Sequence, residues 1–131
     1  MTEPQPPKVL VVDDAATVRM YHTKLLGDAG FAVQEAANGL EAVEAALTTA
    51  FDLFVVDINM PRMNGYTCVE TLRSETVGTP APVLMISTED RPGDADRAYA
   101  AGANLYLVKP VAADRLVRVA RMLTAGRGVT A

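Results

Sequence analysis

The sequence has one cysteine, one histidine and no long apolar run, and each of these features excludes a class of protein. Cys68 is the only cysteine, so no disulfide can form within the chain, which fits a reducing cytosol. The longest apolar runs, at residues 9–12 and 53–56, are too short to span a bilayer. His22 is the only histidine and has no metal-binding or nucleophilic residue near it in the sequence. We therefore predict that His22 is a partly packed helix residue and that Cys68 is a small core residue.

Positive charge is also scarce. The chain has 12 Lys and Arg residues against 16 Asp and Glu residues, which gives a formal net charge of −4. Nucleic-acid binding depends on clustered basic residues, so we do not expect a nucleic acid to be the main partner. The arginines at 115, 118 and 121 are interpreted as a solvated helix flank.

The length and hydrophobic content predict one globular domain. A chain of 131 residues is close to the commonest domain size, and its hydrophobic fraction of 50% is well above that of disordered chains. We expect a disordered Pro-rich leader at 1–7, a folded domain at 8–124 and a short tail at 125–131. The leader has no apolar stretch of signal-peptide type, so we expect a cytoplasmic protein without membrane insertion.

Short apolar segments alternate with helical patterns along the chain. Strands are predicted at residues 8–12, 31–36, 51–56, 82–86 and 105–108, and the second, which is the most polar, suits a sheet edge. Helices are predicted at residues 15–29, 40–50, 64–73, 92–101 and 112–123. Five βα repeats predict an α/β fold, flavodoxin-like and doubly wound, with a five-stranded parallel sheet in the order 2-1-3-4-5.

Polar residues follow four of these strands. They are Asp13-Asp14 after the first strand, Asp57 and Asn59 after the third, Ser87-Thr88 after the fourth, and Lys109-Pro110 after the fifth. In a parallel sheet of this order, these groups gather at one edge, outside the carboxyl ends of the strands. We therefore predict the functional site at that edge.

Three carboxylates at one site require a cation. A pair of carboxylates about 4 Å apart repels by about 4 kcal/mol at an effective dielectric of ~20. Oxygen ligands without histidine or cysteine favour Mg²⁺, Mn²⁺ or Ca²⁺, and Mg²⁺ commonly shares its shell between carboxylates, water and phosphoryl oxygens. Lys109 supplies a second positive charge and Ser87 a hydroxyl donor. Together these groups are suited to hold a phosphoryl group on a carboxylate nucleophile.

This set of motifs resembles the receiver domain of two-component response regulators. The shared elements are the Asp pair, the run D-x-N-M-P-x-M-x-G from Asp57, the S-T-E run from Ser87, and Lys109-Pro110. The resemblance covers about residues 8–124. Within the family the chain is most similar to the stand-alone chemotaxis (CheY) type, because Asn59, Glu89 and Tyr106 match its variable positions. The chain departs from the family pattern at two places. Ser87 stands where Thr is common, and Pro92-Gly93 stands at the start of the fourth helix.

The resemblance implies a role for each acidic residue. Asp57 is expected to accept the phosphoryl group. Asp14 and Asp57 are expected to bind Mg²⁺ directly, together with the backbone carbonyl of Asn59, while Asp13 acts through a water molecule. Asn59 and Glu89 are expected to tune dephosphorylation.

The resemblance also implies a switch and its partners. Ser87 and Lys109 are expected to contact the phosphoryl oxygens, Tyr106 to change rotamer on activation, and the Lys109-Pro110 bond to be cis. The phosphoryl donor is expected to be a sensor histidine kinase or a histidine phosphotransfer protein. The downstream protein target is expected to bind the fourth helix, fifth strand and fifth helix of a monomer.

Simpler interpretations exist for each residue taken alone. Asp13 or Asp14 could cap the first helix, Asp57 could be a turn residue, and Tyr106 could be an ordinary strand aromatic. As a different function, a Mg²⁺-dependent phosphohydrolase of the haloacid-dehalogenase kind also uses a strand-end aspartate. Such enzymes need a second acid where this chain has Asn59, and an amide cannot act as a general acid-base. A degenerate receiver is a third alternative, against which the complete set of acids, hydroxyl and lysine argues. Motor control, phosphorelay and kinase feedback remain open as pathways.

Overall fold

The computed structural model describes residues 5–88 and 91–125, and five strands alternate with five helices along them. The strands are β1 (Lys8–Val12), β2 (Ala32–Ala36), β3 (Leu53–Asp57), β4 (Val83–Ser87) and β5 (Leu105–Val108). The helices are α1 (Ala16–Asp28), α2 (Gly39–Thr48), α3 (Gly65–Leu72), α4 (Asp94–Ala101) and α5 (Ala113–Leu123). The predicted leader and tail lie largely outside the described residues, although the Pro7 carbonyl accepts a hydrogen bond from the Ala32 amide.

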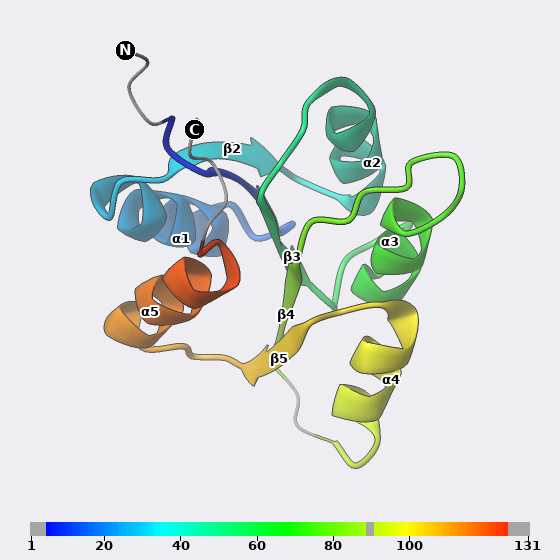
Figure 1. Ribbon diagram of the computed structural model, residues 1–131. Helices are drawn as coiled ribbons and strands as arrows, with labels where there is room; N and C mark the ends of the chain where they lie inside the picture. Colours follow the sequence, from blue (N-terminus) through cyan, green and yellow to red (C-terminus); the bar gives the residue numbers. More distant parts are fainter. Residues whose placement is uncertain (1–4, 89–90, 126–131) are drawn as a thin grey trace.

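The strands form one parallel sheet in the order β2-β1-β3-β4-β5 (Figure 1). The predicted fold class and strand order are therefore confirmed. The sheet is covered on one side by α1 and α5 and on the other by α2, α3 and α4. As predicted, the polar strand β2 lies at an edge, where two of its five side chains are exposed.

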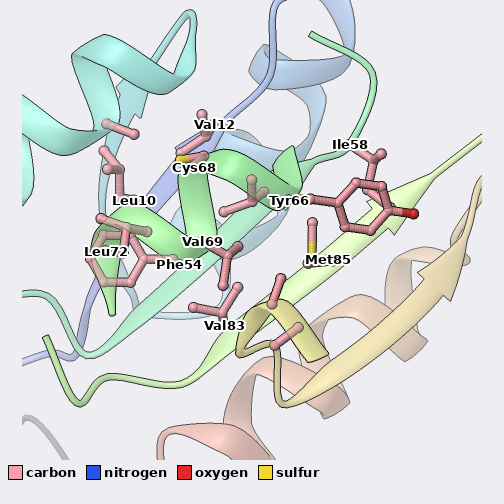
Figure 2. Packing of buried hydrophobic residues seen from close by; sticks show 14 of the residues in the cluster. Leu10, Val12, Phe54, Ile58, Tyr66, Cys68, Val69, Leu72, Val83 and Met85 are labelled. Carbon is pink, nitrogen blue, oxygen red and sulfur yellow. The ribbon is translucent and has the colours of Figure 1, made fainter. Parts of the chain in front are cut away.

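Two apolar layers flank the sheet because successive side chains of a strand point to opposite faces. Leu10, Phe54 and Met85 belong to the layer under α2, α3 and α4, part of which is shown in Figure 2. Their neighbours Val9 and Leu53 belong to the layer under α1 and α5. The three central strands are therefore buried on both faces, which explains their continuous apolar sequences.

The helix boundaries agree with the predictions to within two residues, and the start of α4 has a clear local cause. The helix was predicted from residue 92 but begins at Asp94. Gly93 has φ = 89°, so the Pro92-Gly93 pair forms a left-handed turn before the helix and not its first turn. The first turn of α4 carries Asp94 and Asp96, whose charge is favourable at a helix N-terminus.

No helix in the described ranges is both long and apolar enough to span a membrane. The longest of the five helices, α1, has 13 residues, whereas a span requires about 20.

Candidate functional site

The carboxyl ends of β1, β3 and β4 bring the predicted site residues together. Val12 pairs with Val56 across β1 and β3, and Asp57 pairs with Ile86 across β3 and β4. In this register the three strands end at nearly the same height in the sheet. Asp13, Asp57 and Ser87 therefore lie together at one edge. All three are buried, with exposures of 2%, 6% and 2%.

Lys109 bridges two of the carboxylates. Its Nζ donates to Asp13 Oδ2 at 2.9 Å and to Asp57 Oδ1 at 3.2 Å, and its side chain is only 13% exposed. The other Asp13 oxygen, Oδ1, accepts from the Ala15 amide at 2.9 Å. The Lys109-Pro110 bond that leads out of β5 is cis, as the family resemblance implied.

The pKa values of Asp57 and Lys109 are both raised, for different reasons. Burial, then the negative charge of Asp13, raises the pKa of Asp57 to about 6, although Lys109 opposes the change. Burial alone would lower the pKa of Lys109, but the hydrogen bond to Asp13 and the charge of Asp57 outweigh it and raise that pKa. Lys109 is therefore a stable cation, but it does not fully offset the burial of the Asp57 charge and its repulsion from Asp13.

The carboxylates of Asp13, Asp14 and Asp57 fit a divalent cation. Each offers an oxygen, and these oxygens lie within 4.8 Å of one another. Asp13 and Asp57 are buried whereas Asp14 is exposed, so the cluster opens toward solvent on the Asp14 side. Hard oxygen ligands with room for water are the ligand set that Mg²⁺ favours.

The loop after β3 holds Asn59 and Gly65 close to this cluster. Asn59 is exposed, and its amide donates to the Thr88 hydroxyl at 3.3 Å. A Cβ on Gly65 would lie 2.6 Å from the Asp57 carbonyl oxygen and 2.7 Å from Ile58 Cα. Only glycine lets the start of α3 approach the backbone of β3 this closely.

The predicted switch residues lie on adjacent strands, two positions apart in the register. Ser87 ends β4, and Tyr106 lies on β5 directly opposite Met85. Tyr106 is half-buried and packs against the apolar layer under α4. Glu89, the other predicted tuning residue, lies outside the described residues.

A pocket beside the cluster was not predicted from the sequence. Its volume is about 470 Å³, and it extends from Asp14 and Ser87 to side chains of α3 and α4, among them Tyr66 and Arg97. The Arg97 guanidinium carbon lies 4.1 Å from the centre of the Tyr66 ring. No short motif joins two residues so far apart in the chain, and their contact depends on how α4 packs against α3.

His22 is more deeply buried than the sequence indicated, with an exposure of 5%. Burial, followed by the positive charge of Lys109, lowers the pKa of His22, so its ring is neutral at pH 7. As predicted, it packs within a helix, and Cys68 is a fully buried core residue.

Comparison with known proteins identifies the family. A family model described as the response regulator receiver domain matches residues 9–121. The chain belongs to the response-regulator receiver family. Receiver domains act in phosphoacceptor signalling and are not enzymes in the usual sense.

Two curated relatives illustrate the range of the family. The transcriptional regulatory protein CusR of Escherichia coli is 38% identical over 123 residues, which cover 93% of this chain and 53% of CusR. This chain therefore spans about half the length of CusR. The chemotaxis protein CheY-3 of Vibrio cholerae is 40% identical over 110 residues, which cover 83% of this chain and 85% of CheY-3.

Solved structures give the same result. The chemotaxis protein CheY4 of Vibrio cholerae has a TM-score of 0.84 and 36% identity, with 90% of this chain and 98% of CheY4 covered. These matches confirm the predicted CheY-type receiver. The receiver domain of the sensor histidine kinase PA1611 of Pseudomonas aeruginosa, which carries a magnesium ion in its active-site cleft, has a TM-score of 0.83 and 25% identity. The match covers 91% of this chain and 98% of the PA1611 domain.

Proposed function

We propose that this receiver takes a phosphoryl group on Asp57 in a Mg²⁺-dependent reaction. The donor in this proposal is a sensor histidine kinase or a histidine phosphotransfer protein. The observation that carries the proposal is the contact of Lys109 Nζ with both Asp13 and Asp57, beside the exposed carboxylate of Asp14. A turn or helix cap would not need a buried lysine between two buried acids.

The raised pKa of Asp57 suits a nucleophile. A pKa of about 6 leaves the carboxylate ionised at pH 7 and makes it more basic than an exposed aspartate. In the transfer, a carboxylate oxygen of Asp57 attacks phosphorus as the bond from phosphorus to the donor imidazole nitrogen breaks, and the imidazole leaves with the electron pair. Lys109 then binds a phosphoryl oxygen, and the Ser87 hydroxyl donates to another.

Mg²⁺ is proposed as the ion of this site, held by Asp14, Asp57 and the Asn59 carbonyl, with Asp13 acting through water. When bound, it neutralises the acids and the phosphoryl oxygens. The magnesium ion in the cleft of the PA1611 receiver supports this choice by analogy. Because few protein atoms bind the ion, we expect modest affinity that is lost in Asp14→Ala.

The outgoing signal is proposed to pass through α4, β5 and α5 to a protein target. Movement of the Ser87 hydroxyl toward a phosphoryl group would open space beside β4, into which Tyr106 on the adjacent strand could turn. A partner that prefers the inward Tyr106 state would then be recruited by phosphorylation. Exposed apolar side chains on this surface, Tyr99, Val108 and Met122, suit a protein partner.

The central test is labelling by acetyl phosphate, followed by intact-mass measurement. The wild-type protein should gain one phosphoryl group with Mg²⁺ and none with EDTA, whereas Asp57→Asn should gain none. Equal labelling of Asp57→Asn would refute the assignment. Sustained hydrolysis of a general phosphate ester by the wild-type protein would instead support the phosphohydrolase alternative.

A further inference from the structure

The pocket next to Asp57 is larger than a phosphoryl group requires. Its volume of about 470 Å³ lies within the range of about 300–1,000 Å³ that small-molecule sites occupy. Asp14, Asn59 and Ser87 line the part that belongs to the candidate phosphorylation site. The remaining lining is of a different kind. It combines apolar side chains and arginines with Asn64 and Asp94, and it has no role in the proposed phosphoryl transfer.

Arg97 is the distinctive cation of this second part. Its guanidinium lies on the face of the Tyr66 ring, at 4.1 Å from the ring centre, and Tyr66 itself is only 6% exposed. Arg91, the other arginine of the lining, already contacts Asp94, with 3.9 Å between its Nε and the carboxylate. Within residues 5–88 and 91–125, Arg97 forms no ion pair, so its N–H donors are available to an anion.

The walls around Arg97 suit the organic part of a small molecule. Ile58, Met60 and Pro61 contribute to the lining. In Figure 2 the Tyr66 ring lies at the border of the apolar cluster, with its hydroxyl pointing away from the other labelled side chains. That hydroxyl contacts the Asp94 carbonyl at 3.5 Å, which links α3 to the start of α4. Asn64 and Asp94 also line this part, and Asp94 is the partner of Arg91. A lining that combines apolar side chains, polar groups and a cation without an ion-pair partner in the described residues is suited to a carboxylate attached to a small organic group.

We propose that this part of the pocket binds the leaving group of a small acyl phosphate, and that Arg97 determines the preference for such a donor. The inference rests on the proposed phosphorylation of Asp57. A carboxylate oxygen of Asp57 attacks phosphorus, and an O–P bond forms as the bond from phosphorus to the acyl oxygen breaks. The acyl group departs as a carboxylate with the electron pair, and Arg97 stabilises the negative charge that develops on it.

The same cation gives little advantage to a donor with a P–N bond. The nitrogen of phosphoramidate leaves as neutral ammonia, and a phosphohistidine imidazole likewise leaves without negative charge. Arg97 should therefore accelerate transfer from acyl phosphates relative to transfer from phosphoramidates. This selectivity separates a leaving-group role from a merely structural role of Arg97, which would affect both donors equally.

The test compares two donors on one set of variants. The second-order rate constant for Asp57 phosphorylation is measured by intact mass, with acetyl phosphate and with phosphoramidate, at fixed Mg²⁺ and ionic strength. Arg97→Gln should lower the rate with acetyl phosphate about three-fold to five-fold relative to the rate with phosphoramidate. Arg97→Glu, which reverses the charge, should lower that ratio further. Arg118→Gln, an exposed arginine on α5, makes the same change in net charge and should leave the ratio unchanged.

Each outcome bears on the inference. An unchanged ratio in both Arg97 variants, or an equal loss with both donors, would overturn it while leaving phosphorylation of Asp57 intact. An equal change of the ratio in Arg118→Gln would assign the effect to net charge and would also overturn it. If neither donor labels the wild-type protein, the proposed function fails first and this inference fails with it.

Discussion

Removal of the Asp57 charge should stabilise the fold in the absence of a metal ion. Burial and the neighbouring Asp13 raise the pKa of Asp57 from 3.8 to about 6, which means that the folded protein disfavours its ionised form. Converted at about 1.4 kcal/mol per pH unit, this difference corresponds to at most about 3 kcal/mol at pH 7. We expect Asp57→Asn to raise the free energy of unfolding by about 1–3 kcal/mol in EDTA. The amide has no buried charge and no repulsion from Asp13, and it leaves Lys109 paired with Asp13.

The raised pKa of Asp57 makes the stability of the wild-type protein depend on pH. Between about pH 4 and pH 6 the folded protein holds a proton on Asp57 that the unfolded chain has already lost. Stability of the wild-type protein therefore falls through this window as the pH rises, and Asp57→Asn removes that contribution. His22, whose pKa is lowered, contributes in the opposite direction up to about pH 6.5 in both proteins. The difference between variant and wild type at each pH thus isolates Asp57.

Urea unfolding at pH 4, 5, 6 and 7.5 measures this difference. The gain from Asp57→Asn should be near zero at pH 4 and largest at pH 7.5. Asp28→Asn removes an exposed acid from α1 and serves as the control, with an expected effect within about 0.5 kcal/mol at every pH. A stability gain that is absent at pH 7.5, or that is equal at pH 4 and pH 7.5, would refute the reasoning.

A divalent cation should reduce the difference in stability between Asp57→Asn and the wild-type protein. Mg²⁺ at ten times its dissociation constant should stabilise the wild-type protein by about 1.4 kcal/mol. Asp57→Asn lacks one proposed ligand and should gain less. Stabilisation of both proteins to the same extent would argue against Asp57 as a ligand of the ion.

Three further predictions concern single residues near the site, with Gly27→Ala in α1 as a control, and all are measured by urea unfolding. Lys109→Met should cost about 3 kcal/mol at pH 7.5 in EDTA, because two buried carboxylates lose their cation, and clearly less at pH 5; an equal loss at both pH values would contradict this. Gly65→Ala should cost at least about 2 kcal/mol, because the new Cβ would meet the backbone of Asp57. Gly27→Ala lies within α1, where no atom obstructs a Cβ, and should instead stabilise the protein by about 0.5–1 kcal/mol. If both glycine variants changed the stability in the same direction, contact with the backbone of Asp57 would not explain the loss in Gly65→Ala. Arg62→Gly should gain up to about 1 kcal/mol, since Arg62 has φ = 68°, and a loss would mean that its side chain stabilises the loop.

The sheet and the acidic site could be predicted because both leave local signals in the sequence. Buried strands such as β3 are short, apolar and followed by a polar residue, and parallel topology then brings those residues to one edge. The strand order was predicted from the five βα repeats, and it makes β1 and β3 neighbours, which places the Asp pair beside Asp57. The cis bond before Pro110 was known only through the family resemblance, because nothing in the local sequence requires it.

Contacts between distant helices could not be predicted in the same way. Arg73 looked like an ordinary residue at the end of a helix. Its guanidinium donates to the carbonyls of Gly102, Thr79 and Ala81, at the opposite edge of the sheet from Asp57. Such contacts depend on the packing of α3 and α4, which alternating hydrophobicity does not specify. The Tyr66–Arg97 pair was missed for the same reason.

The burial of two acids lowers the stability of the fold, but it also favours the binding of a cation that the proposed function needs. Burial of Asp13 and Asp57 between β1 and β3 destabilises the fold at neutral pH, and Lys109 offsets only part of that cost, as the raised pKa of Asp57 indicates. The remaining repulsion favours binding of any further positive charge at this edge. In the proposed mechanism, that charge is a divalent ion, and its presence lets Asp57 accept a phosphoryl group that would otherwise add to the repulsion. A more stable cluster, such as that of Asp57→Asn, would therefore bind the ion less well and could not carry the signal.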